Sequence, residues 1–365
     1  MKNTIGNAVT LTLFGESHGA ATGVVLDGLC PGIPVDRTAI ERQLDLRRPF
    51  GAISTARREP DAFEILSGVY EGKTTGTPLC ISIPNTQTRS ADYDALRTVA
   101  RPGHADYTGY VKYHGFADPR GGGHFSGRLT APIVAAGAIL LTMLREKGID
   151  LGTHIARCAG IADRGFADPA HELPLLNEKR FAVLDDAAGE AMQAAILAAA
   201  ADGDSVGGVL ETVVTGVPAG VGEPWFDSVE SVLSRALFAI PAVKGVEFGD
   251  GFAVSELRGS AANDPMTVDA GRVVTLTNRN GGINGGITNG MPILFRTAVK
   301  PTPSIFKSQD TVDFVKNEPR VLSLSGRHDP AIVHRARVVV DSMTALVLVD
   351  LLTGRYGTDW WKERK

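Results

Sequence analysis

The chain of 365 residues carries a formal net charge of −4, so it lacks the basic excess of a protein that coats nucleic acid. Hydrophobic residues make up 43% and charged residues 21% of the chain, a balance that excludes bulk disorder and most fibrous classes. The 42 glycines and 20 prolines specify many turns, so we expect loops to carry the functional site.

The predicted secondary structure begins with two strands joined by a glycine-flanked turn. Alternation at residues 9–13 predicts the first strand, and residues 22–29 are expected to form the second. The turn between them places His18 at a strand end. A helix capped by Asp36 and ending near residue 48 is expected next.

Further strands and helices follow along the chain. Apolar or alternating runs predict strands at residues 63–69, 78–83, 208–217, 252–257 and 293–299. Helical periodicity predicts helices at residues 128–147, 186–201, 227–238 and 336–355. The irregular stretch at residues 87–125 is expected to be an ordered loop region anchored by glycines and aromatic residues.

The order of these elements indicates the fold class. Strands occur in neighbouring groups separated by long helices, which favours layered α+β architecture over a doubly wound sheet. No period of ~20 to 50 residues recurs, which argues against a solenoid or propeller. No Ser- or Pro-rich tether cuts the chain, so residues 1–365 are expected to form a single catalytic domain.

Cysteine usage and the apolar segments bear on the compartment. Cys30, Cys80 and Cys158 are widely spaced, so we expect apolar thiols in a reducing cell interior rather than a disulfide framework. The N-terminal residues lack a signal-peptide pattern. The most apolar segment, residues 131–144, is shorter than the ~20 residues of a membrane helix. We therefore expect a soluble, cytoplasmic protein without a membrane partner.

A partial match to the phosphate-binding loop ends in Gly72, Lys73 and Thr74. Ser67 stands where that motif has its first glycine, and the following residues do not open a helix. A hairpin turn is therefore the better prediction. No Gly-x-Gly-x-x-Gly sequence follows a strand, so a dinucleotide-binding Rossmann site is unsupported.

Two histidines lie on glycine-flanked turns, where an imidazole can face a cleft. His18 and His104 could transfer protons near neutral pH, although a structurally bonded histidine is as good an interpretation for either one alone. Neither belongs to a metal-binding pair on one helical face, so no metal site is expected.

Arginines in or beside turns point to an anionic ligand. They are Arg47, Arg48, Arg57, Arg58, Arg101, Arg120, Arg128 and Arg327. Their planar cations suit carboxylate and phosphate, whereas scattered surface charge explains any single one equally well. The glycine runs at residues 121–123 and 281–286 let backbone amides approach an anion or a flat ring closely. Together they favour a pocket for a small anionic molecule.

These residues belong to segments that resemble a known family. The segments are residues 14–19, 57–61, 101–107, 120–123, 242–247, 281–283, 300–302 and 327–330. In this order, and with the apolar C-terminal helix, they resemble the chorismate synthases. The resemblance covers nearly the whole chain, far more than one short motif could support.

The resemblance implies a βαβ-sandwich fold with long helices and antiparallel sheets, and a homotetramer. It implies an anti 1,4-elimination of phosphate from 5-enolpyruvylshikimate 3-phosphate, giving chorismate in the shikimate pathway to aromatic amino acids. It also implies reduced FMN, which transiently supplies an electron without net redox change. The substrate has two carboxylates and a phosphate, which explains why a slightly anionic protein needs several arginines in one cleft.

The resemblance also implies roles for individual residues. His104 is expected to be the acid at the departing phosphate, His18 the proton donor toward the flavin ring, and Asp329 an aid to proton movement at the flavin's central nitrogen. The expected substrate-binding residues are Ser17, Arg47, Arg48, Arg101, Ser126, Arg128 and Arg327. The expected flavin-binding residues are His124, Phe125, Ser126, Pro241, Ala242, Gly285, Lys300, Pro301, Thr302, Pro303, Ser304 and Arg327.

The chain departs from the family pattern at several of these positions. His124 replaces an arginine at the flavin edge, and Phe125 replaces a hydroxyl-bearing residue. Pro241 stands where asparagine is common, the segment around Ile53 is shortened and lacks an arginine, and Asp341 replaces a glutamate.

Two other functions remain to be separated from the elimination. One is an ATP-dependent phosphotransferase that uses Gly72, Lys73 and Thr74. The other is a non-catalytic protein that binds phosphorylated metabolites, although the two histidine turns count against it. The sequence leaves open whether the protein reduces its flavin with NADPH or depends on an external flavin reductase.

Overall fold

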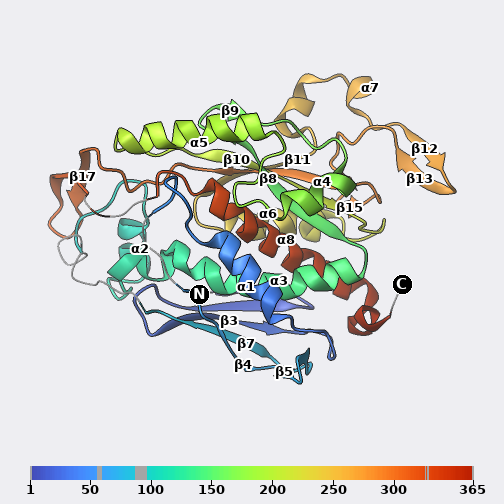
Figure 1. The fold of residues 1–365 in the computed structure, drawn as a ribbon, viewed down its shortest axis with the longest axis horizontal. Coiled ribbons are helices and arrows are strands. Elements are labelled where there is room, and N and C mark those ends of the chain that lie inside the picture. Colours follow the sequence, from blue (N-terminus) through green and yellow to red (C-terminus); the bar gives the residue numbers. More distant parts are fainter. Residues whose placement is uncertain (1, 56–59, 87–96, 325, 327–328, 364–365) are drawn as a thin grey trace.

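The computed structural model describes residues 2–55, 60–86, 97–324, 326 and 329–363. Its main strands form two antiparallel five-stranded sheets that enclose a layer of helices (Figure 1). The first sheet has the order β1-β2-β3-β7-β4. Its strands are β1 (Thr4–Ile5), β2 (Thr10–Gly15), β3 (Ala21–Asp27), β7 (Leu79–Pro84) and β4 (Glu64–Ser67).

The second sheet lies on the other side of the helical layer and has the order β11-β16-β10-β8-β9. Its strands are β11 (Val243–Phe248), β16 (Ile293–Val299), β10 (Gly208–Thr215), β8 (Asp150–Cys158) and β9 (Ile161–Ala162). Register pairs such as Glu211 with Arg296 and with His154 place charged side chains side by side on the face of this sheet.

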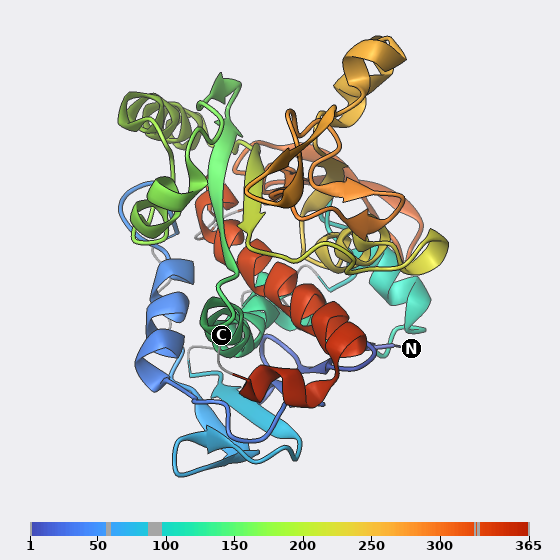
Figure 2. The same ribbon diagram turned by 90° about the vertical axis from the view of Figure 1, so that its right-hand side faces the viewer.

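Four helices fill the middle layer: α1 (Arg37–Arg47), α3 (Thr130–Glu146), α6 (Val229–Phe238) and α8 (Val333–Tyr356). Figure 2 shows α8 crossing the molecule between the two sheets. Most of its 24 residues are buried, because a helix between two sheets meets apolar side chains on both sides. One hydrophobic cluster therefore includes β3, α3, α8 and β10.

The apolar helix at residues 127–146 meets the length and hydropathy of a membrane span, but 83% of that window is buried inside the structure. It packs against α1 and α8 and is a core helix of the sandwich.

Helices α4 (Pro169–Leu176) and α5 (Asp186–Ala201) lie outside the second sheet (Figure 1). Leu173 and Leu176 of α4 pack on Val213 of β10 in a separate small cluster. The second sheet is thus covered on both faces, which explains why five consecutive residues of β10, 210–214, are buried.

Short hairpins and short helices complete the fold. The hairpins pair β5 (Val69–Tyr70) with β6 (Lys73–Thr74), β12 (Met266–Asp269) with β13 (Arg272–Thr275), β14 (Ile283–Asn284) with β15 (Ile287–Thr288), and β17 (Gln309–Asp313) with β18 (Glu318–Leu322). The short helices are α2 (Asp106–Lys112), α7 (Gly259–Ala262), η2 (Arg120–Phe125), η3 (Gly127–Leu129), η4 (Trp225–Asp227), η5 (Gly251–Glu256) and η6 (Thr358–Lys362). The segment with α7, β12 and β13 projects from the body (Figure 1).

The predicted α+β layering is confirmed, and most predicted elements lie where expected. The strand at residues 293–299 has the predicted bounds, and the Asp36 side chain caps α1 by accepting a hydrogen bond from the Thr38 amide. The rejected phosphate-loop match is a hairpin whose turn has positive φ at Glu71 (47°) and Gly72 (73°).

The predicted strand at residues 252–257 is wrong, because residues 251–256 form the 3₁₀ helix η5. This segment is mostly exposed, and within the described part of the chain no strand pairs with it, so its apolar alternation lacks a sheet on which to pack. Strand β8 went unpredicted because five consecutive residues, 151–155, are buried and the alternation that marks a one-sided strand is lost. The helix α2 lies inside the stretch expected to be a loop.

Candidate active site

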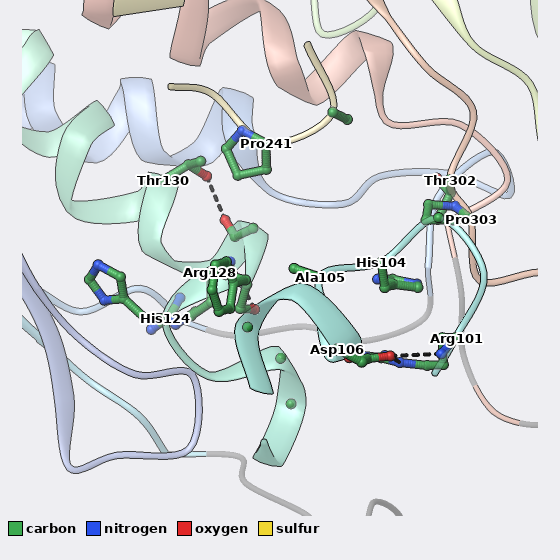
Figure 3. A pocket seen from close by; sticks show the side chains of 18 of the residues that line it. Arg101, His104, Ala105, Asp106, His124, Arg128, Thr130, Pro241, Thr302 and Pro303 are labelled. Carbon is green, nitrogen blue, oxygen red and sulfur yellow. Dashed lines mark hydrogen bonds and ion pairs between the residues drawn. The ribbon is translucent and has the colours of Figure 1, made fainter. Parts of the chain in front are cut away.

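A cavity of about 890 Å³ opens where loops from both halves of the chain meet the ends of the middle-layer helices. The cavity is lined by the C-terminal end of α1, the η2–η3 segment, the loop before α2, the end of α6, the start of α8, and Lys300, Thr302 and Pro303. In Figure 3, His124 and Arg128 lie to one side of α2, and Arg101 and His104 to the other. Its volume suits a small-molecule ligand.

One end of the cavity carries a cluster of arginines around the carboxylate of Asp61. Arg128 Nη1 pairs with Asp61 Oδ1, and Arg47 Nη1 lies 3.3 Å from Asp61 Oδ2. Arg48 Nε lies 4.0 Å from the same oxygen. The carboxylate is 1% exposed, so one buried negative charge orders three cations. An excess of positive charge remains at this end, which suits an anion.

Arg47 is further fixed by the start of α3. Its Nε donates to Thr130 Oγ1 (2.8 Å), and its Nη2 donates to the Gly127 carbonyl (3.0 Å). Because both partners belong to the segment that carries Arg128, the two arginines are held relative to one another.

Ser17 and His18 lie on the turn after β2, beside the triple-glycine segment. The Ser17 amide donates to the Gly123 carbonyl (3.1 Å), and Gly121, with φ of 61°, packs on the His18 ring. A Cβ atom at Gly121 would lie 2.6 Å from His18 Nε2, so only glycine fits between this ring and the cavity that Gly121 lines. The side chains of Ser17 and His18 are both buried.

His104 lies in the loop before α2, opposite the arginine cluster. Its Nε2 is 2.7 Å from the hydroxyl of Ser304, and the nearby Lys300 Nζ donates to the Gly103 carbonyl (2.6 Å). The imidazole is therefore held by the segment at residues 300–304, two hundred residues further along the chain.

Arg101 is engaged by Asp106 rather than extended toward the arginine cluster. Arg101 Nε and Nη2 donate to the two oxygens of Asp106 at 2.9 and 2.7 Å (Figure 3). Burial alone would raise the pKa of Asp106, but the hydrogen bonds and charge of Arg101 outweigh it and lower this pKa. This ion pair links Arg101, in the loop before α2, to Asp106, the first residue of α2, and both residues line the cavity.

Asp329 lies at the start of α8, where two donors hold its carboxylate. Its Oδ1 accepts from the Thr55 amide (2.8 Å) and its Oδ2 from Arg335 Nη1 (2.6 Å). Arg335 Nε also donates to the Arg47 carbonyl (2.9 Å), which links Asp329 to the arginine end of the cavity.

The residues expected at a flavin line the same cavity from three segments. His124 Nδ1 bonds the Gly15 carbonyl at 2.8 Å, and the Phe125 ring is 44% exposed and contacts Gly109 of α2. Pro241 and Ala242 follow α6, and Ala242 has a φ of 76°, a strained conformation for a residue with a side chain. This wall combines an aromatic face with exposed backbone, as a flat ring requires.

The structure does not bring every expected residue to the cavity. Ser17, His18 and Ser304 are buried and do not line it, Pro301 is outside the lining, and Gly285 lies in the exposed turn between β14 and β15. Arg120 is also outside the lining and pairs with Asp118, which lines the cavity. Arg327, Arg57 and Arg58 lie outside the described residues.

Sequence reasoning missed the carboxylates and the cation that hold the others in place. Asp61, Asp106 and Arg335 all line the cavity and bind expected site residues. Asp61 and Asp106 belong to segments that carry the family resemblance, which was the available signal. Arg335 had no such signal, because its role depends on the approach of α8 to α1.

The other departures from the family pattern lie in the core. Ile53 is 4% exposed, and Asp341 is buried in α8, where its Oδ1 accepts from Thr153 Oγ1 (2.6 Å). Burial raises the pKa of Asp341 to about 6, although the charge of Arg337 opposes this shift. Ile53 and Asp341 therefore contribute to the packing of the core and do not line the cavity.

The donor set fits a flavin. Among the described residues, Ser17 Oγ and Thr302 Oγ1 are buried without a hydrogen-bond partner, so both have hydrogen-bonding capacity for a ligand. Cations, an aromatic face and exposed backbone surround the same space. Across the described part of the chain, no group of three His, Cys, Asp or Glu side chains could hold a metal ion.

The fold and site thus define an enzyme of layered α+β architecture whose cavity takes a small, multiply anionic molecule. The family model described as chorismate synthase matches residues 9–353. The chorismate synthase of Thermococcus kodakarensis is 46% identical over 352 residues, covering 96% of this chain and 97% of that protein. The chorismate synthase of Dehalococcoides mccartyi strain BAV1 is 46% identical over 354 residues, covering 96% of each.

A solved crystal structure of chorismate synthase superimposes with a TM-score of 0.76 at 29% identity, covering 97% of this chain and 94% of the other. The chain belongs to the chorismate synthase family. It is a carbon–oxygen lyase that eliminates phosphate from 5-enolpyruvylshikimate 3-phosphate to give chorismate in aromatic amino-acid biosynthesis, and its family implies a flavin cofactor.

Proposed function

We propose that the cavity binds reduced FMN beside the substrate. Some of the expected site residues then bind the substrate, others bind the flavin, and three transfer protons. The observation that carries this proposal is that one cavity is lined by three cations around Asp61, by His104 across from them (Figure 3), and by Asp329 just before α8, which Arg335 links to Arg47. Reduced FMN, when bound, supplies a transient electron to the substrate and recovers it, so that no net redox change occurs.

The arginine cluster binds the substrate anions in this proposal. Arg47, Arg48 and Arg128 are ordered by a buried carboxylate, so little side-chain entropy is lost when they meet carboxylate or phosphate. The hydroxyl of Ser17, which lies beside Gly121 of the cavity wall, is proposed to add a donor, and Ser126 lines the cavity itself. Arg101 belongs to the His104 side, and Arg327 keeps its expected role as a partner of both ligands.

Proton transfers fall to two imidazoles and a carboxylate. His104, positioned by Ser304, acts as the acid at the departing phosphate, and His18 donates a proton toward the flavin ring. Asp329, held by Thr55 and Arg335, assists proton movement at the central nitrogen of the flavin.

The flavin wall consists of His124, Phe125, Pro241, Ala242 and residues 300–304. Lys300 is the partner proposed for the FMN phosphate. Gly285 remains a proposed contact although it lies away from the cavity within one chain.

An anaerobic assay with FMN, dithionite and the shikimate phosphate ester tests the proposal. Phosphate release without ATP supports the flavin-dependent elimination, and ATP dependence would favour a phosphotransferase. Binding of the ester without any phosphate release from folded protein would favour a non-catalytic binding protein. A transient change in the flavin spectrum followed by return to the reduced form reports cofactor participation directly.

The source of the reduced flavin is tested by the same preparation. Oxidation of NADPH by the FMN-loaded protein assigns flavin reduction to this chain, whereas its absence assigns it to an external flavin reductase.

We also propose a homotetramer of chains that each fold as one domain over residues 1–365. Exposed apolar side chains on the projecting hairpin, such as Met266 (63%) and Val268 (69%), support burial against another copy, and the shared hydrophobic cluster supports one folding unit. Light scattering measures the assembly. A cytoplasmic location is proposed on the family's biosynthetic role and on three free cysteine thiols.

A further inference from the structure

Asn85 connects two parts of the site that are far apart in sequence. It follows the last residue of β7, where the first sheet ends beside the cavity, and its backbone amide donates to the Ala20 carbonyl (3.1 Å). Its side chain is half-buried. The position is thus fixed by the sheet before the side chain makes any contact.

The side-chain amide uses both of its donor hydrogens on one turn. Nδ2 donates to the Glu16 carbonyl and to the Gly19 carbonyl, each at 2.9 Å. These two carbonyls flank Ser17 and His18, so a single amide group holds both ends of the turn that carries them. The turn's own hydrogen bond, from the Gly19 amide to the Glu16 carbonyl, is 3.1 Å long.

The other end of the same amide holds an arginine. Asn85 Oδ1 accepts from Arg128 Nε at 3.2 Å, on the side of the guanidinium opposite to Asp61. Only one amide orientation is compatible with these partners, because the reverse would place an oxygen against two carbonyls and an NH₂ group against a cation.

We propose that Asn85 is a positioning residue that fixes the Ser17–His18 turn and Arg128 relative to one another. The proton donor toward the flavin and the cation that binds the substrate are then held in fixed relative positions, without a search over side-chain conformations. This inference rests on the proposed roles of His18 and Arg128. Asn85 itself lies outside the cavity lining and acts through them.

Double-mutant cycles test the inference with KM and kcat measured separately. Asn85→Ala is expected to lower kcat/KM by about 10- to 100-fold, the range typical of residues that orient a functional group. In the His18→Ala background the same change is expected to lower kcat by no more than about 2-fold, and in the Arg128→Ala background to raise KM by no more than about 2-fold. Such non-additivity is the signature of a residue that acts through the other two.

Two further variants sharpen the experiment. Asn85→Asp keeps an oxygen for Arg128 but faces the carbonyls of Glu16 and Gly19 with an acceptor, so its loss of kcat is expected to match that of Asn85→Ala. Asn85→Ser replaces Asn85→Ala in the cycles if the alanine variant does not fold.

Asn177→Ala is the matched control. Asn177 Nδ2 donates to the Leu151 carbonyl (3.1 Å) in a remote part of the fold. Loss of this hydrogen bond is expected to lower the Tm, and its effects on kcat and KM are expected to be additive in both backgrounds. Full kcat and KM for Asn85→Ala, or additive effects in both cycles, overturn the inference. If His18→Ala keeps its kcat and Arg128→Ala keeps its KM, the proposed roles fail first and the inference falls with them.

Discussion

The guanidinium of Arg128 and the carboxylate of Asp61 form an ion pair with only 6% and 1% of their side chains exposed. The pair joins the start of α3 to the segment after α1, and Arg47 shares the same carboxylate at 3.3 Å. Breaking a buried pair leaves an uncompensated charge, which costs far more than the loss of an exposed pair. The arginines that are proposed to bind the substrate are therefore ordered before any ligand arrives.

Asp61→Asn is expected to lower the Tm, because three arginines then lie close together without their counter-ion. The loss of stability is bounded by the ~3–5 kcal/mol of a broken buried pair, since asparagine keeps one acceptor. Added inorganic phosphate should recover more of the Tm in the variant than in the wild type. Thermal unfolding with and without phosphate measures both effects, and an unchanged Tm in low salt would remove Asp61 from this role.

Arg128→Ala is expected to weaken substrate binding by about 2–5 kcal/mol, since the arginine is buried against Asp61 and is proposed to bind an anion of the substrate. Titration of the substrate into the folded variant checks the prediction. Arg42→Ala is a suitable control, because Arg42 forms a surface pair with Glu178. Normal affinity in Arg128→Ala would place this arginine outside the binding site.

His104→Ala is expected to slow turnover by about 100-fold or more with little change in substrate affinity, as for the loss of a general acid. Ser304→Ala should have a smaller effect in the same direction, because it removes only the 2.7 Å contact that orients the ring. Steady-state kinetics of both variants provide the measurement. An unchanged rate in His104→Ala would reassign the acid.

Gly121→Ala is expected to lower both stability and turnover. Its φ of 61° costs a residue with a side chain about 1–2 kcal/mol. The added Cβ would also lie 2.5 Å from His18 Cδ2 and displace the ring. Gly122→Ala is the control, since its φ is 82° but its nearest neighbour, Ser126 Cβ, lies 3.8 Å away. Equal kcat losses in the two variants would contradict a specific effect on His18.

His334→Gln tests a buried histidine in α8. Burial, and then the charge of Arg335, lower the pKa of His334 from 6.5 to about 3. Below pH 6.5 the unfolded chain binds a proton that the folded protein does not, so this group makes stability fall as the pH drops from 6.5 toward 3. Glutamine does not titrate, so the Tm of the variant should fall less over this window. Parallel Tm curves for the two proteins would refute the shift.

Secondary structure was predictable where packing is one-sided or where a cap is present. The Asp36 cap and the apolar face with Ile40 and Leu44 define α1, and all three features are visible in the sequence. Strand β8 was not predicted because it is buried on both faces and shows no alternation. The segment that forms η5 was predicted as a strand because alternation alone does not show whether a neighbouring strand exists.

The sequence motifs predicted which residues belong to the site, but they did not predict which of these residues contact one another. The turns carrying His18 and His104 have glycines that the chain shows directly. The contact of Arg335 with the Arg47 carbonyl is different, because it joins α8 to the end of α1 over 288 residues of sequence. Local sequence carries no sign of such a contact.

The sequence by itself determined the layered class, the hairpin at Lys73 and the family, because each depends on local patterns or on many short matches in order. Only the tertiary structure decided that Asp61 orders three arginines, that Asn85 bridges the His18 turn to Arg128, and that Gly285 lies away from the cavity. The physical reason is that charge pairing and hydrogen bonding act over a few ångströms in space, whereas the partners here lie tens to hundreds of residues apart.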